Sequence, residues 1–137
     1  MPYRLVEHTA DVIVEAEGAC CARAFEDAAA AMYAVIVPQG TIEAREWRTI
    51  EVEGDGLEDL LLGWLTELNY LTDTESLVFS AFQIERLETR HLTGRAGGEP
   101  FDPARHEGGL IVKGITRHLL QVRQEDERCL VTVTLDV

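Results

Sequence analysis

The chain has 137 residues, a length that suits one domain with a hydrophobic core of its own. Hydrophobic residues make up 46% of it and charged residues 27%, which is typical of globular proteins and excludes a disordered chain. The 25 acidic residues outnumber the 12 basic ones and give a net charge of −13. Such a charge disfavours direct binding to nucleic acid or to an anionic membrane, and it favours a basic partner protein or bound cations.

The sequence gives no sign of targeting to a membrane or of secretion. The first eight residues do not resemble a signal peptide, and no apolar run approaches the roughly 18–20 residues that span a bilayer. The three cysteines are an odd number, two of them are adjacent (Cys20 and Cys21), and none forms a CxxC pair. We therefore expect neither a disulfide framework nor a cysteine zinc site, and we expect a cytoplasmic protein.

The N-terminal part predicts two short strands and a helix. Residues 5–7 and 12–16 are β-like runs on either side of a polar break at residues 8–11, and apolar side chains alternate in the second run. From residue 19 to about residue 35, an alanine-rich segment carries apolar side chains at helical spacing. This pattern predicts a first helix that ends before Pro38.

The middle of the chain predicts a strand, a second helix and a further long strand. Alternation over residues 47–54 indicates a strand, and a leucine stripe at i, i+3, i+4, i+7 spacing over residues 57–71 indicates a helix. Residues 77–92 have the pattern of one long, mixed strand. Residues 94–109 contain five glycines and two prolines, so we expect a loop there and the most mobile part of the chain.

The C-terminal third predicts a β-hairpin. Residues 110–123 and 128–137 are β-rich, and the charged residues 124–127 separate them. Together the elements predict an α+β fold in two layers, with two helices packed on a mixed, mainly antiparallel sheet.

The predicted hairpin brings charged groups together at one end of the sheet. If its turn is centred on Asp126, residues whose numbers sum to about 251 face each other. Asp136 then lies near Ile115, and Val137 lies near Lys113, the only lysine in the chain. One side-chain carboxylate, the carboxylate of the last residue and one ammonium group would meet there.

These oxygens suggest a cation site. The carboxylates of Asp136 and Val137 repel one another, so a pair that is partly shielded from water needs protons or a cation. Oxygen ligands suit Mg²⁺, Ca²⁺ or Mn²⁺. Asp11, in the polar break before an apolar strand, is the best candidate for a third ligand. The alternatives are a turn in which Asp11 bonds its own backbone, and a solvated, frayed chain end at residues 136–137.

Other chemistry is poorly supported. Four histidines are scattered along the chain without HxH or HxxxH spacing: His8, His91, His106 and His118. Cys20 and Cys21, at the start of a helix, are typical of small buried cysteines, although a helix N-terminus can also activate a thiol. The sequence has neither a GxxxxGKS/T nor a GxGxxG loop. Residues 95–99 are glycine-rich without a following helix, which favours a flexible loop over a phosphate site.

Several motifs, in order along the chain, resemble the archease family. They are HTADV at residues 8–12, Gly18 before a helix with Phe25 and Ala31-Met32, LLGWL at residues 61–65, Gly98-Glu99 with Asp102 and His106, KGIT at residues 113–116, and the final Asp136-Val137. The match runs from the first strand to the last residue. The combination of the HTADV opening, the VKxxT strand and the Asp-aliphatic end is specific. The resemblance implies a single archease-like domain over residues 1–137, with a strand-helix-strand-strand module and added strands.

The resemblance also implies a function. Archeases are small acidic proteins that activate the GTP-dependent RNA ligase RtcB, which joins tRNA halves after intron removal. The chain would then be an activator rather than an enzyme, promoting guanylylation of the ligase's catalytic histidine and so permitting multiple turnovers. The family binds a divalent cation, reported as calcium, which here implies Asp11, Asp136 and Val137 as ligands. Ile13 stands where many members have glycine, and Arg117 where an aromatic residue is common; neither change removes a ligand.

We expect the end of the molecule that bears Asp11, Asp136, Val137 and Lys113 to reach into the metal–nucleotide pocket of the ligase, because the chain has no phosphate cradle of its own. Lys113 would balance the carboxylates or contact a phosphate; the alternative is an ordinary exposed cation. Two other functions stay open at this point. One is a metal-independent interaction module or chaperone, and the other is a metal-dependent phosphoesterase.

Overall fold

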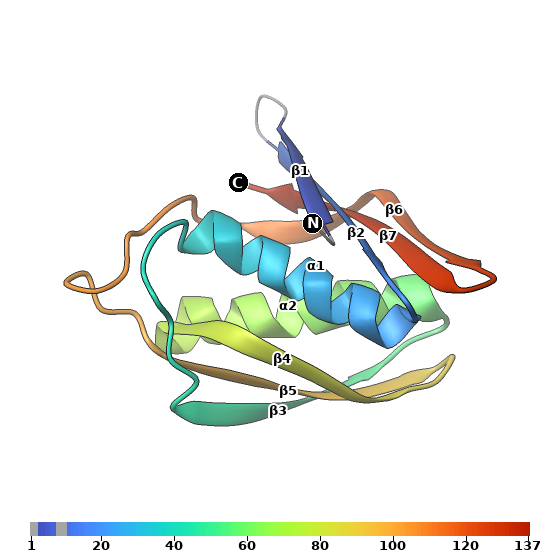
Figure 1. Cartoon of the computed structure of the whole chain (residues 1–137), viewed down its shortest axis with the longest axis horizontal. Helices are drawn as coiled ribbons and strands as arrows, with labels where there is room; N and C mark the ends of the chain where they lie inside the picture. Colours follow the sequence, from blue (N-terminus) through green and yellow to red (C-terminus); the bar gives the residue numbers. More distant parts are fainter. Residues whose placement is uncertain (1–2, 8–10) are drawn as a thin grey trace.

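The structure is a computed structural model that describes residues 3–7 and 11–137 (Figure 1). Its elements follow one another as β1 (Tyr3–Glu7), β2 (Asp11–Gly18), α1 (Cys21–Ile36), β3 (Glu46–Glu53), α2 (Leu57–Glu75), β4 (Leu77–Leu87), β5 (His91–Pro100), β6 (Gly114–Glu125) and β7 (Arg128–Asp136). In the described part of the chain, no helix is long and apolar enough to cross a membrane.

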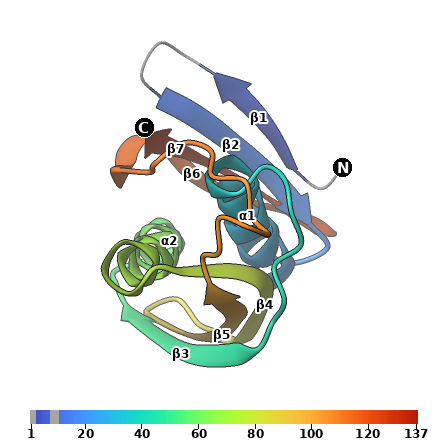
Figure 2. The ribbon, with the colours of Figure 1, turned by 90° about the vertical axis from the view of Figure 1, so that its left-hand side faces the viewer.

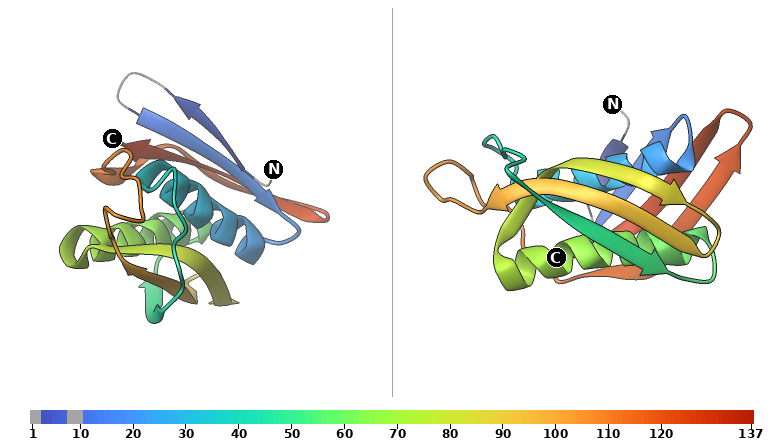
Figure 3. Two further views of the ribbon diagram at one scale, coloured as in Figure 1. Left: turned by 60° about the vertical axis from the view of Figure 1, so that its left-hand side comes forward. Right: turned by 90° about the horizontal axis from the view of Figure 1, so that it is seen from below.

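The strands form two separate antiparallel sheets, of order β1-β2-β7-β6 and β3-β5-β4. Both helices lie between the sheets (Figures 1 and 3), with α1 against β2, β7 and β4, and α2 against β6 and β3. The predicted α+β class and the two helices are confirmed. The predicted arrangement of two layers, with the helices on a single sheet, is wrong, because the helices form a middle layer between two sheets.

The position of α1 between two sheets explains its alanine content. Ala24, Ala28 and Met32 have no exposed surface, and small side chains allow both sheets to approach a helix that is buried on nearly every side. Trp64 of α2 is also fully buried, and its Nε1–H donates to the carbonyl oxygen of Phe25 at 3.1 Å. The two helices are therefore joined by apolar packing and by a buried hydrogen bond.

The glycine-rich segment is a strand, so the loop predicted for residues 94–109 is wrong over residues 94–100. These residues belong to β5, the central strand of its sheet. A Cβ on Gly97 would collide with the ring of Trp47, and one on Gly98 would collide with the backbone of β4. The glycines mark close approach of neighbouring groups within a sheet rather than a turn. Because β5 completes its own three-stranded sheet with β3 and β4, the single sheet expected from the sequence becomes two.

A disulfide between Cys21 and Cys129 corrects the expectation from cysteine spacing. The two Cα atoms are 5.0 Å apart although 108 positions separate them in sequence, and Cys20 is exposed and free. Cys129 pairs with Gly18 across the β2–β7 ladder, which places it beside the start of α1. Only the fold brings these cysteines together. The cysteine argument for a reducing compartment is therefore lost, and the cytoplasmic location stays a prediction.

Candidate metal centre

The first residue of β2 and the last residue of β7 face each other. Asp11 pairs with Asp136, and the next pair along the ladder is Val12 with Leu135. Val12 and Leu135 are buried in the core, so strand alternation places the two aspartates on the outer face of the sheet, where both are half-buried. Two acidic residues from opposite ends of the sequence thus lie side by side; we call them the acidic pair.

The acidic pair is electrostatically unfavourable on its own. Directly opposed residues of an antiparallel ladder have Cβ atoms roughly 4.5–5.5 Å apart. Two unit charges at about 5 Å repel by about 0.8 kcal/mol at the dielectric constant of water, and by more where water is partly excluded. Within residues 3–7 and 11–137, neither carboxylate has a hydrogen-bond donor or an ion-pair partner. A bound cation would remove this repulsion.

Strand β6 lies on the other side of β7, and its first residue, Gly114, pairs with Asp136. Lys113 precedes it; this residue is exposed, and its main-chain N–H donates to the carbonyl oxygen of Asp136 at 2.7 Å. The predicted meeting of Lys113 with the end of β7 is therefore observed for the main chain. The pairing is displaced by one residue, since Ile115 lies opposite Leu135 instead of Asp136.

The position of the hairpin turn and a β-bulge in β6 together cause this displacement. Next to the turn, Glu125 lies opposite Arg128, so the paired residue numbers sum to 253 rather than about 251; beyond the bulge, Gly114 lies opposite Asp136 and the sum is 250. The ladder with β7 is regular from the turn to Gln121 and then shifts before Thr116. Within the bulge, Leu119 has a φ of 62°, in the left-handed region that a leucine rarely adopts. The hydroxyl of Thr134 donates to the carbonyl oxygen of His118 at 2.7 Å and holds the bulge against β7. Counting from the hairpin turn could not include these extra residues.

The other ligands considered from the sequence are Val137 and the HTADV motif. Val137 follows Asp136 directly, and its side chain packs against the hydrophobic core. Residues 8–10 of the HTADV motif, including His8, lie outside the described residues. In the part of the chain that the structure describes, no group of three or more His, Cys, Asp and Glu side chains is placed to hold a metal ion. Two carboxylates suit a hard cation, but further oxygens would have to come from the main chain, water or a partner.

The family-specific changes noted in the sequence leave the acidic pair in place. Ile13 is 8% exposed and pairs with Thr134, one step along the outer face from Asp11. Arg117 lies in the bulge, where its guanidinium pairs with the carboxylate of Asp59 at 2.8 Å. The first substitution therefore adds apolar packing, and the second adds an ion pair to α2.

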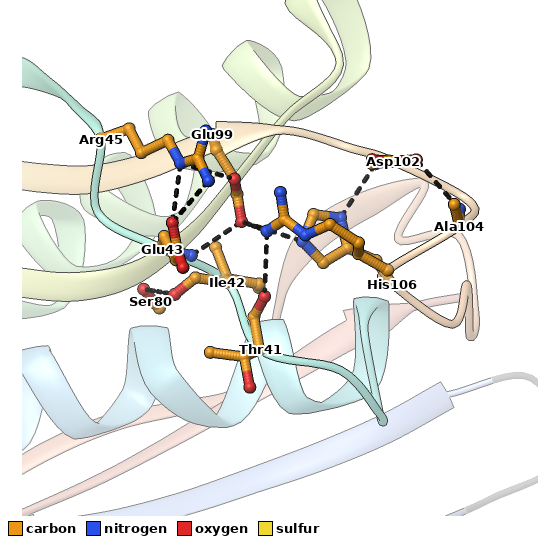
Figure 4. A network of polar contacts seen from close by, with 10 residues as sticks. Thr41, Ile42, Glu43, Arg45, Ser80, Glu99, Asp102, Ala104 and His106 are labelled. Carbon is orange, nitrogen blue, oxygen red and sulfur yellow. Dashed lines mark hydrogen bonds and ion pairs between the residues drawn. The ribbon is translucent and has the colours of Figure 1, made fainter.

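A separate carboxylate, that of Glu99, lies in a network of hydrogen bonds and ion pairs that sequence reasoning did not find (Figure 4). Its side chain is buried, and it receives a hydrogen bond from Arg105, one from the main-chain N–H of Glu43 at 2.8 Å, and an ion pair from Arg45 at 3.4 Å. Chiefly the Arg105 hydrogen bond, then the Glu43 N–H, lowers the pKa of Glu99 to about 2. We call these residues, with His106, the Glu99 network.

The geometry of His106 fixes its tautomer. Its Nδ1 accepts from the main-chain N–H of Asp102 at 2.9 Å, so the ring proton resides on Nε2, which donates to Glu99 at 3.0 Å. The ring is buried and both nitrogens are engaged. This histidine holds residues 101–107 against the end of β5, rather than offering a free nitrogen for catalysis or metal binding. The sequence hint was its place with Glu99 and Asp102 in the resemblance.

Comparison with known proteins agrees with the motifs. A model of the Archease protein family (MTH1598/TM1083) matches residues 3–137. Protein archease of Pyrococcus furiosus is 42% identical over 135 residues, 96% of this chain and 95% of that protein, and protein archease of Sulfurisphaera tokodaii is 34% identical over 137 residues, 98% of each.

Solved structures give the same result. The solution structure of Methanobacterium thermoautotrophicum protein 1598 matches with a TM-score of 0.84 and 34% identity, covering 99% of each chain. The crystal structure of an archease and possible chaperone from Thermotoga maritima has a TM-score of 0.60 at 18% identity over 96% of this chain and 94% of that one, and so supports the fold alone. The chain belongs to the archease family.

Proposed function

We propose that this chain activates an RtcB-type, GTP-dependent RNA ligase in tRNA splicing, by promoting guanylylation of the ligase's catalytic histidine and allowing multiple turnover. Family membership supports the partner class. The observation that carries the proposed site is the pairing of Asp11 with Asp136 on an outer sheet face, with no partner for either carboxylate in the described part of the chain.

The proposed cation is divalent, calcium by family resemblance, with Mg²⁺ or Mn²⁺ as alternatives. Asp11 and Asp136 would hold it with carboxylate oxygens, and Val137 would contribute a main-chain oxygen. When bound, such an ion supplies positive charge that phosphate oxygens of a nucleotide can share. The remaining ligands would come from water or from the ligase.

Lys113 is proposed to act beside this site. Its main-chain N–H is hydrogen-bonded to the carbonyl oxygen of Asp136, so this exposed residue lies at the same end of the sheet as the acidic pair. From there its ammonium group balances the carboxylates or contacts a phosphate in the ligase pocket. The acidic surface, with a net charge of −13, accelerates encounter with a basic, RNA-binding enzyme.

Single-turnover guanylylation of the purified cognate ligase tests the proposal. Asp11→Asn, Asp136→Asn and Lys113→Ala should each reduce the stimulation by this chain at least tenfold. Asp126→Asn, an exposed aspartate in the β6–β7 turn at the far end of the same strands, is the matched control and should stimulate normally. Wild-type stimulation by all three site variants would contradict the proposed site.

A metal-independent chaperone or interaction module is the second candidate, because the T. maritima structure with this fold is described as a possible chaperone. It predicts ligase binding and stimulation that persist unchanged in chelator and in Asp136→Asn. The activator proposal predicts that chelator and this variant have the same effect, and that the chain alone does not hydrolyse phosphoesters.

A further inference from the structure

A groove runs beside the C-terminal half of α2. It has a volume of about 520 Å³ and lies between this helix and residues 108–112, with Ile36, Val78 and Phe101 among its lining. Val112 lines it as well, and the next residue, Lys113, is bonded to Asp136. Figure 2 faces this end of the molecule and shows the end of α2, the chain that leads into β6, and the C-terminus together. The groove therefore opens at the same end of the molecule as the acidic pair, which lies on the outer face of the neighbouring sheet.

Exposed apolar side chains gather at this groove. Four large hydrophobic residues are exposed in the described part of the chain, and two of them, Leu110 and Ile111, line the groove, with Ile111 77% exposed. A third, Tyr70, lies one helical turn before Asp73 on α2, and Asp73 lines the groove. The fourth, Leu119, is in the β6 bulge. Clustering of this kind on a polar surface marks a binding surface, whereas single exposed residues do not.

The wall of the groove is held in place before any partner arrives. The main-chain N–H groups of Gly109 and Leu110 donate to the last turn of α1 at 2.8 and 3.1 Å. From the other side, the Asn69 side chain of α2 donates to the carbonyl oxygen of Val112 at 3.0 Å. Ile111 is thus presented by a fixed backbone, which reduces the ordering entropy lost on binding.

The charge at this groove is negative and unbalanced. Among the described residues that line it, Asp73 is the charged one; it is exposed and has no ion-pair partner in that part of the chain. It lies in the last turn of α2, which contains no basic residue. The C-terminus of a helix carries partial negative charge and favours cations, so an acidic side chain there adds to a potential that it should oppose. A lysine or arginine from another molecule would neutralise both the Asp73 carboxylate and the partial negative charge at the end of α2.

We propose that this groove docks a basic amphipathic segment of the ligase, in which an apolar side chain lies over Ile111 and Leu110 and a flanking lysine or arginine reaches Asp73. The inference rests on the proposed function for the identity of the partner. In this proposal the groove determines the affinity for the ligase, and the acidic pair stimulates guanylylation of the ligase. One partner can engage both, because Val112 lines the groove and Lys113 is bonded to Asp136.

Two groove variants of the full chain test this assignment against matched controls. Ile111→Ser should raise the Kd for the purified ligase about tenfold, as expected for a contact of moderate hot-spot strength. Asp73→Asn should raise it less and should reduce its dependence on salt. Leu119→Ser removes an equally large exposed leucine outside the groove, and Asp55→Asn removes an exposed acid before the other end of α2; both should bind as wild type. At saturating concentration both groove variants should stimulate guanylylation fully.

A photo-crosslinker at position 111 identifies the occupant. In the wild-type background it should capture a ligase peptide that has lysine or arginine within a few residues of an apolar side chain. Equal Kd values for Ile111→Ser and Leu119→Ser would overturn the docking proposal while leaving the activator proposal intact. Crosslinking to a second copy of this chain, or to an acidic ligase peptide, would also overturn it. If wild type neither binds nor stimulates the ligase, both proposals fail.

Discussion

The protein places carboxylates in two different settings. Glu99 is 2% exposed and surrounded by donors, from Arg105, from the Glu43 main chain and from His106. Asp11 and Asp136 are half-buried and face each other, with no donor to either among residues 3–7 and 11–137. A buried carboxylate that serves the fold is fully hydrogen-bonded, because an unpaired one is costly. The acidic pair lacks that support among the described residues, and this difference is the reason for proposing a cation there.

The disulfide and the acidic pair lie at opposite ends of the β2–β7 ladder. Cys129, opposite Gly18, carries the disulfide at one end, and the acidic pair lies at the other. The double variant Cys21→Ala, Cys129→Ala should lose about 3–4 kcal/mol of unfolding free energy, because the bond closes a long loop. Denaturant unfolding measures the loss. Cation affinity at the other end should not change, and a parallel loss of affinity would mean that the site depends on the distant end.

Removal of one aspartate tests the acidic pair as a ligand site. Asp11→Asn and Asp136→Asn should each weaken calcium binding by about a hundredfold, or about 2.7 kcal/mol, since each takes away a charged oxygen ligand. Calorimetric titration of the chain alone provides the readout. Asp126→Asn should bind calcium normally. Equal weakening in this control would show that only the overall negative charge matters.

The Glu99 network should make the thermal stability of the protein depend on pH, and comparison with Glu99→Gln separates this contribution from that of the acidic pair. Glu99→Gln should lower the Tm by roughly 5 °C at pH 7, because Arg105 and the Glu43 N–H lose a charged acceptor. The pKa of Glu99 is about 2 in the folded chain and about 4.3 in an unfolded one, so its stabilisation is present above pH 4.3 and is lost as pH falls toward 2. Melting curves of both proteins should therefore converge near pH 2. A gap that stays constant over this range would contradict the network.

The smallest expected effect has the opposite sign. Without divalent cations, Asp136→Asn should stabilise the fold by about 0.8 kcal/mol at low salt, because it removes the repulsion from Asp11. Chemical unfolding in chelator measures this difference. Destabilisation by this variant would show that Asp136 has a stabilising partner in the native state, as Glu99 does.

Local patterns were sufficient for the helices. The alanine-rich segment predicted α1, observed at Cys21–Ile36, and the leucine stripe predicted α2, observed at Leu57–Glu75, since 3.6-residue periodicity records a buried face directly. The strand with three glycines, β5, could not be predicted in the same way. Gly97 and Gly98 make room for Trp47 and for the backbone of β4, which are distant in sequence.

The candidate site was predictable in outline. A hairpin argument brought Lys113 near the end of the chain and suggested Asp11 as a neighbour, and the observed pairs are Asp11–Asp136 and Asp136–Gly114. The error of one residue is the difference between two larger ones. The turn lies later than expected, with Glu125 opposite Arg128, and the bulge at Leu119, which no turn rule encodes, shifts the register back. The Cys21–Cys129 bond and the donors around Glu99 arise from tertiary contacts, so spacing along the chain contained no record of them.

In the proposed site, Asp11 and Asp136 share one divalent cation. A crystal structure of the full chain grown with calcium tests it most directly. We expect one ion between the two carboxylates, with oxygen distances of about 2.3–2.6 Å, and no ion there in Asp136→Asn crystals grown in the same way. Carboxylates that turn away from each other, with calcium bound elsewhere or not at all, would contradict it.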